Sequence, residues 1–118
     1  MPAPHLRIAF RRSGRSLPLA PALSHTAYRV AQEALTNAVR HSGATEVDLH
    51  IRQDRKRMVI SIADNGPIQP SARRPAEGQG IRGMRERVLA CGGTLAAGPR
   101  EPHGWLTEAV LPITEEPG

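Results

Sequence analysis

Hydrophobic positions change their spacing along the chain, and each spacing predicts a different element. Between Ala27 and His41 the apolar residues recur every three or four positions, which is typical of a helix with one buried face. Pro21 suits the first turn of this helix, and Gly43 suits the position after its last turn. We therefore expect a helix over about residues 21–42.

Alternation of apolar and polar residues predicts strands elsewhere in the chain. The alternating segments are residues 6–10, 47–51, 58–62, 95–97 and 105–111. A turn is expected at residues 11–15 after the first strand, and residues 54–57 are expected to close a hairpin between the second and third strands. One-sided alternation favours an antiparallel sheet that packs helices on a single face.

A long segment without periodicity separates the third strand from a second helix. Residues 65–80 contain three prolines and several glycine and serine residues, so we expect a loop. A loop of this length in a compact domain is usually functional, disordered or both. Helical spacing returns at Ile81 and ends at Gly92-Gly93, and the tail over residues 114–118 is expected to fray.

Length and composition limit the classes of function. With 118 residues, the chain suits one domain around a single core. It has no run of about 18 apolar residues and no secretory signal, so we expect a soluble, cytoplasmic chain that makes no membrane contact itself. The lone Cys91 lies among apolar residues and is expected to be a small core residue.

The chain is basic, with 16 Lys and Arg residues against 11 Asp and Glu residues. This balance favours either a polyanion or a phosphorylated ligand as the partner. The arginines are scattered, and one Phe, one Trp and one Tyr leave few rings for stacking on bases. We therefore do not expect nucleic-acid binding.

One polar stripe of the long helix is a candidate site. Glu33, Asn37 and His41 recur every four residues, which places a carboxylate, an amide and an imidazole on one face. Arg29 and Arg40 lie beside this stripe. The alternative is an ordinary solvated face of an amphipathic helix, and the residue types alone do not decide between the two.

Two further segments carry candidate chemistry. Asp64 ends a strand just before Gly66, where a carboxylate can accept from an exocyclic amine and a glycine lets a ligand approach the backbone. A plain turn is the alternative for this pair. The glycine-rich segment 78–83 opens the second helix, and free N–H groups with the positive end of the helix dipole make such a segment a general anion site.

Three sequence boxes together resemble a known family. The boxes are Gln32-Glu33-Ala34-Leu35-Thr36-Asn37-Ala38-Val39-Arg40-His41, then Asp64-Asn65-Gly66, and then Gly80-Ile81-Arg82-Gly83-Met84-Arg85-Glu86-Arg87 followed by Gly92-Gly93. This set resembles the ATP-binding catalytic domain of two-component sensor histidine kinases, in the branch typified by the nitrate/nitrite sensors. Over about residues 5–113, the resemblance implies the fold shared with gyrase, mismatch-repair ATPases and a heat-shock chaperone. That fold is an α/β (α+β) two-layer sandwich with a mixed, mostly antiparallel sheet and helices on one face.

The resemblance also implies roles for the boxes. Asn37 would coordinate the Mg²⁺ that bridges the phosphates of ATP, and Glu33 would be the catalytic residue that orients metal-bound water or assists proton transfer. Asp64 would accept a hydrogen bond from the adenine amine, with Gly66 beneath the ring. The other nucleotide-binding residues implied are Arg40 and His41 near the phosphates, and Gly78, Gly80, Ile81 and Gly83 at the phosphate loop and the start of the following helix.

Two positions depart from the family pattern. Ile68 stands where a second glycine usually follows the aspartate box, and Trp105 stands where the last strand often has a threonine near the adenine. In this family the phosphate acceptor is a histidine on a separate dimerising helical hairpin, which does not fit before residue 20. The implied partners are therefore ATP, the hairpin domain of a parent kinase and, through it, a response regulator. We expect the chain to bind ATP and Mg²⁺ without completing autophosphorylation by itself.

Two other functions stay open at this point. One is an anti-sigma type serine kinase or a nucleotide-binding regulator on the same fold, which the segment Arg85-Glu86-Arg87 disfavours by resemblance. The other is a catalytically inactive binding module or a basic polyanion binder. Ile68, Trp105 and the positive charge motivate this last alternative.

Overall fold

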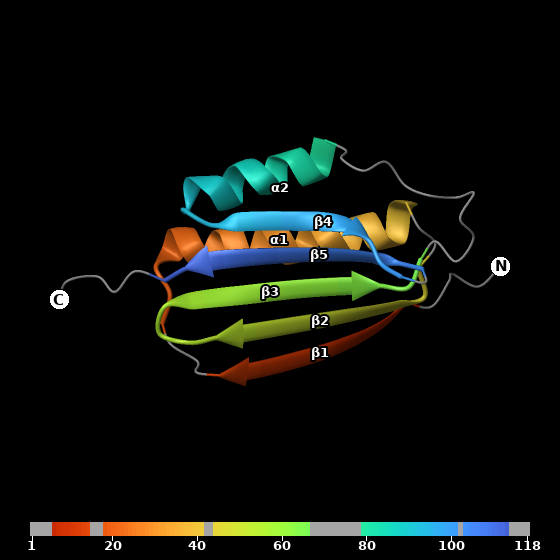
Figure 1. Cartoon of the computed structure of the whole chain (residues 1–118), viewed down its shortest axis with the longest axis horizontal. Coiled ribbons are helices and arrows are strands. Elements are labelled where there is room, and N and C mark those ends of the chain that lie inside the picture. The colour runs from red at the N-terminus through yellow and green to blue at the C-terminus, as the bar shows by residue number, and fades with distance from the viewer. Residues whose placement is uncertain (1–5, 15–17, 42–43, 67–78, 102, 114–118) are drawn as a thin grey trace.

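Five strands form one mixed sheet, and two helices lie on the same face of it (Figure 1). The computed structural model describes residues 6–14, 18–41, 44–66, 79–101 and 103–113, without the side chains at positions 40, 41, 79 and 80. In chain order the elements are β1 (Arg7–Gly14), α1 (Pro21–His41), β2 (Glu46–Gln53), β3 (Arg57–Asp64), α2 (Gln79–Ala90), β4 (Thr94–Pro99) and β5 (Trp105–Pro112). The predicted α+β fold with helices on one face is confirmed.

The first strand makes the sheet mixed. The strand order is β1-β2-β3-β5-β4, and β1 pairs with β2 in parallel, whereas the other three pairs are antiparallel. Parallel neighbours cannot be joined by a tight turn, so the long helix α1 makes the crossover between β1 and β2. The end of α1, the end of β3 and the start of α2 consequently meet at one end of the molecule, on the right in Figure 1.

The core fills the space between the sheet and the helices. Along β5 the residues alternate between buried positions on the helix-covered face and more exposed positions on the other face. The largest fully buried side chains are Ile60, Met84, Leu111, Val30, Val47 and Val88, which come from both helices and from three strands. Burial of each such side chain is worth about 1.5–3 kcal/mol. This apolar layer holds α1 and α2 in place over the sheet.

The first strand is longer than the sequence predicted. A turn was expected at residues 11–15, but β1 continues to Gly14, so this expectation is wrong. All eight residues of β1 are exposed, and an edge strand tolerates charged residues because they stay in water while the backbone pairs with β2. Gly14 has a φ of 84°, and a Cβ there would overlap the carbonyl oxygen of Gln53. The strand therefore ends at a glycine in close contact with its neighbour.

The other predicted elements agree with the structure to within a few residues. Helix α2 begins two residues before the predicted start at Ile81, and it ends as expected at the glycine pair. Gly92 has a φ of 79° and donates to the carbonyl of Leu89 at 2.9 Å, and Gly93 donates to the carbonyl of Val88 at 2.9 Å. This is a Schellman cap, which satisfies the last free carbonyls of the helix. Of the loop expected at residues 65–80, residues 79 and 80 belong to α2, and residues 67–78 lie outside the described residues, as does the tail.

Candidate functional site

A buried carboxylate marks the end of β3. Asp64 is the last residue of the strand and only 3% exposed, and its Cα partner on β2 is the core residue Val47. Residues in register share a face of the sheet, so the carboxylate lies on the helix-covered side. Aspartate is almost never this buried without hydrogen bonds. At this position the carboxylate can accept a hydrogen bond from a ligand held between the sheet and the helices.

The residues after Asp64 form a local turn. The carboxylate Oδ1 of Asp64 accepts from the backbone N–H of Gly66 at 3.1 Å, which is the two-residue pattern of an Asx turn. The plain-turn interpretation of this box is thus correct as local structure. It does not exclude the ligand-binding interpretation, because an ionised carboxylate has about four acceptor positions.

Trp105 lies beside Asp64 in the sheet. The two residues are Cα partners between β3 and β5, and the indole is 3% exposed and belongs to the hydrophobic core. The shared register puts both side chains on the helix-covered face. The indole is therefore not exposed to solvent, and it lies on the same face as the carboxylate predicted to bind adenine.

Asn65 joins the strand end to the start of β2. Its side-chain Oδ1 accepts from the backbone N–H groups of Thr45 at 2.9 Å and Glu46 at 3.0 Å, and its Nδ2 donates to the hydroxyl of Thr45 at 2.9 Å. The backbone N–H of Asn65 also donates to the carbonyl of Glu46 at 3.2 Å. This residue stood in the recognised box, but its role could not be found by sequence alone because the partners of its side chain lie about twenty residues earlier.

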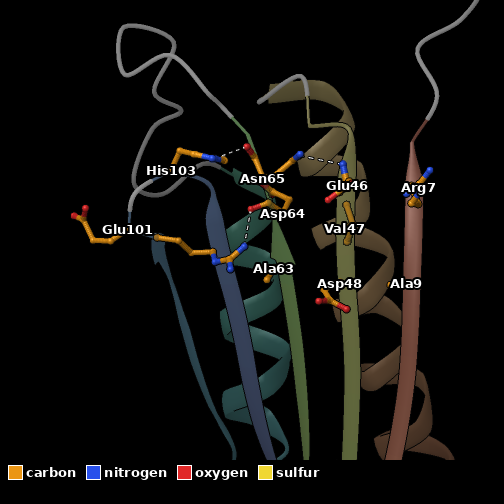
Figure 2. A pocket seen from close by; sticks show the side chains of 11 residues that line it. Arg7, Ala9, Glu46, Val47, Asp48, Ala63, Asp64, Asn65, Glu101 and His103 are labelled. Atoms are coloured by element: carbon orange, nitrogen blue, oxygen red, sulfur yellow. Dashed lines mark hydrogen bonds between the residues drawn. The ribbon is translucent and has the colours of Figure 1, made fainter.

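A cavity of about 530 Å³ lies behind this box, on the sheet face opposite the helices (Figure 2). Residues that line it are Arg7, Ala9, Glu46, Val47, Asp48, Ala63, Asp64, Asn65, Arg100, Glu101 and His103. Arg100 and His103 come from the turn between β4 and β5, and both bond to backbone carbonyls of the box. No sequence signal pointed to these two residues, since they belong to no motif.

The polar stripe of α1 flanks the second helix. Glu33 and Asn37 are half-buried, and Thr26, seven residues before Glu33, contacts the Sγ of Cys91 just after α2 at 3.3 Å. Residues seven and four apart share one side of a helix, so Glu33 and Asn37 lie on the flank that faces α2. Arg40 and His41 belong to the last turn of α1, and their side chains lie outside the described residues.

The start of α2 combines a core residue with an unusually open glycine. Ile81 is 4% exposed and packs in the core, so its side chain serves the fold. A Cβ added at Gly83 would meet nothing within 4 Å among the described residues. Packing within this part of the chain therefore does not require a glycine there. Gly80 lies in the first turn of the helix, and Gly78 and Ile68 lie outside the described residues.

Metal ligands do not form a cluster in the described part of the chain. No group of three or more His, Cys, Asp and Glu side chains could hold a metal ion there. Mg²⁺ commonly takes only one or two protein oxygens and completes its shell with phosphates and water. The amide of Asn37, one turn after the carboxylate of Glu33, fits an ion that arrives with a nucleotide.

The family follows from comparison with known proteins. A sequence profile described as "Histidine kinase-, DNA gyrase B-, and HSP90-like ATPase" matches residues 22–115, which is most of the chain. The chain belongs to this family. It is therefore an ATP-binding domain of the histidine kinase type, and the matched region begins at α1 and includes all three boxes.

Two curated relatives of this histidine kinase-like domain are much longer proteins. It is 37% identical over 93 residues to "Sensor histidine kinase YxjM" of Bacillus subtilis. The aligned region covers 79% of this chain and 22% of that protein. It is 40% identical over 87 residues to the histidine-protein kinase/phosphatase UhpB of Salmonella typhimurium. Here the aligned region covers 74% of this chain and 17% of that protein. The chain thus spans about a fifth of their length.

Solved structures show the same fold. The ATP binding domain of PrrB from Mycobacterium tuberculosis is 25% identical, with a TM-score of 0.65 over 96% of this chain and 84% of that one. The nucleotide-free catalytic domain of the histidine kinase ThkA is 18% identical, with a TM-score of 0.70 over 92% of this chain and 79% of that one. Within the described residues, neither helix of the histidine kinase-like domain is long and apolar enough to cross a membrane.

Proposed function

We propose that the chain is the catalytic domain of a sensor histidine kinase and lies in the cytoplasmic part of that protein. It donates the γ-phosphate of ATP to a histidine on a separate dimerisation domain. Membership of the ATPase family and similarity to sensor kinases support this proposal. The matched residues cover only 22% and 17% of the two relatives, so a parent protein of that length has room for the acceptor domain. In that arrangement residues 5–113 act as one ATP-binding domain, and a response regulator receives the phosphoryl group next.

Asp64 is the observation that carries the nucleotide-binding part of the proposal. A carboxylate that is 97% buried at a strand end, on the helix-covered face, is costly unless it serves a hydrogen-bonding purpose. We assign it to the exocyclic amine of adenine, with Gly66 close to the ring. Trp105, its neighbour in the sheet, would then contact the base from the side.

The phosphate end of the nucleotide is assigned to the facing parts of the two helices. Asn37 would ligate Mg²⁺, which supplies charge neutralisation for the transferred phosphoryl group. Glu33 would hold a water or take the proton of the acceptor histidine. The other residues of this proposed site are Arg40 and His41 on α1, and Gly78, Gly80, Ile81 and Gly83 around the start of α2. Their contribution is positioning and charge stabilisation rather than covalent chemistry.

Ile81 has a different role in this proposal from the neighbouring glycines. Its side chain is buried in the core, so it would anchor the helix start while the backbone faces the phosphates. A nucleotide-binding regulator or a serine kinase is the second candidate, because either would use the same ATP-binding fold.

A nucleotide titration with an acceptor assay tests the proposal. Calorimetry should show ATP binding that requires Mg²⁺, and Trp105 emission should change on binding because the indole adjoins Asp64. A dimerisation domain from a sensor kinase of the same family should then become phosphorylated on histidine when mixed with this chain and ATP. Absence of ATP binding at millimolar nucleotide would refute the proposal, and binding without any transfer would favour the regulator instead.

A further inference from the structure

The turn between β4 and β5 holds the backbone of the aspartate box from behind. Arg100 Nη1 donates to the carbonyl oxygen of Asp64 at 3.1 Å, and His103 Nδ1 lies 2.8 Å from the carbonyl oxygen of Asn65 (Figure 2). The turn is itself closed by the N–H of Arg100, which donates to the carbonyl of Gly104 at 2.9 Å. Two successive carbonyls of the box thus have partners on one short turn.

Gly104 brings this turn into direct contact with the box. Its φ is 110°, and a Cβ built there would overlap the carbonyl oxygen of Asp64. The regular pairing of β3 with β5 stops at Asp64 and Trp105, so the sheet ladder does not extend to Asn65 and Gly66. Beyond this point the box is held on the β5 side by the side chains of Arg100 and His103. On the β2 side it is held by the side chain of Asn65 and by the backbone hydrogen bond from Asn65 to Glu46.

The bonds of the turn reach Asp64 from the face opposite its carboxylate. Arg100 and His103 are exposed and line the cavity on the uncovered face, whereas the carboxylate lies on the helix-covered face. Neither side chain would touch a nucleotide bound between the helices and the sheet. Any effect that these residues have on nucleotide binding must therefore pass through the backbone of the box.

We propose that Arg100 and His103 are positioning residues that fix the Asp64 carboxylate for adenine and so set the preference for ATP over GTP. This inference rests on the proposed nucleotide site. A carboxylate discriminates the amine of adenine from the carbonyl of guanine only if it is held at hydrogen-bonding distance from the base. A small displacement of the carboxylate weakens such a hydrogen bond. A cation on the Asp64 carbonyl and a ring N–H on the Asn65 carbonyl restrict the peptide units that set this distance.

Four substitutions and a matched control test the proposal. Arg100→Ala and His103→Ala remove the two bonds, while Arg100→Lys and His103→Gln keep a donor at each position. Glu101→Ala is the control, because Glu101 lies in the same turn and lines the same cavity, yet its carboxylate points away from Asp64 in Figure 2. Calorimetry with ATP and with GTP, both with Mg²⁺, gives the dissociation constants, and thermal unfolding without nucleotide gives the stability of each variant.

Each alanine variant should bind ATP about three- to tenfold more weakly, which corresponds to one weakened hydrogen bond. GTP binding should stay within twofold, the Lys and Gln variants should recover most of the loss, and Glu101→Ala should match the wild type. Equal losses for ATP and GTP, or no loss for ATP, would overturn the positioning role while leaving the ATP site intact. A wild-type chain that binds ATP no better than GTP would instead overturn the assignment of Asp64 on which the inference rests.

Discussion

Asp64 combines a structural bond with a proposed role in recognition. Its carboxylate already accepts from Gly66 and is almost fully buried. Asp64→Asn keeps an acceptor but introduces an amide that can face the adenine amine donor to donor. We predict that ATP binding weakens by about 1–3 kcal/mol, whereas GTP binding changes little. Competition calorimetry with both nucleotides measures this, and parallel weakening of the two would show that Asp64 does not contact the base.

Asn37 is the amide proposed to ligate the metal. The side chain is half-buried on a helix, where alanine is at least as favourable, so Asn37→Ala should unfold at nearly the same temperature as the wild type. Phosphoryl transfer to a supplied dimerisation domain should fall below detection because the Mg²⁺ contact is lost. Transfer is followed with radiolabelled ATP, and Thr36→Ala, one position away on the same helix, is the matched control. Wild-type transfer by Asn37→Ala would remove the metal role from this residue.

The packing of helix α2 does not require a glycine at position 83. A Cβ there meets no described atom, and alanine is about 0.8–1 kcal/mol better than glycine inside a helix. Gly83→Ala should therefore raise the unfolding midpoint of the nucleotide-free chain by a few degrees. The same Cβ would enter the space proposed for the phosphates, so ATP affinity should fall.

Gly98→Ala is the matched control for this trade of stability against binding. Gly98 also has no described atom within 4 Å of an added Cβ, but it lies in β4, outside the proposed site. Calorimetry should show unchanged ATP affinity for Gly98→Ala. If Gly83→Ala binds ATP as tightly as the wild type does, the glycine does not line the phosphate site.

The turn between β2 and β3 gives a pH-dependent contribution to stability. Hydrogen bonds from the backbone N–H groups of Lys56 and Arg57 lower the pKa of Asp54 below its usual value. A lowered folded-state pKa means that the bonds stabilise the protein fully above about pH 4 and lose their effect as the pH falls through the folded-state pKa. Asp54→Ala should thus lower the unfolding midpoint at neutral pH, and the difference from the wild type should shrink in acid. A difference that stays constant from neutral to acidic pH would contradict this cause.

At the scale of the whole molecule, local patterns were predicted well and distant pairings were not. The span of α1 and the β2–β3 hairpin followed from spacing, caps and turn residues, which act over a few positions. The extension of β1 to Gly14 depends on a neighbour far along the chain, so no local signal marked it. The assignment of Asp64 to a strand end was confirmed, whereas the bonds of Asn65, Arg100 and His103 arise only when separate segments meet.

The edge position of β1 has a consequence for the way the domain opens. This strand contributes no fully buried side chain and is paired on one side only, with α1 and its connections separating it from its partner in sequence. Its detachment exposes little new apolar surface, so it requires much less free energy than global unfolding does. Amide protons of β1 should accordingly exchange through a local opening, while those of β3, in the centre of the sheet, exchange only when the whole domain unfolds. The domain can therefore release its first strand while the sheet around Asp64 stays folded.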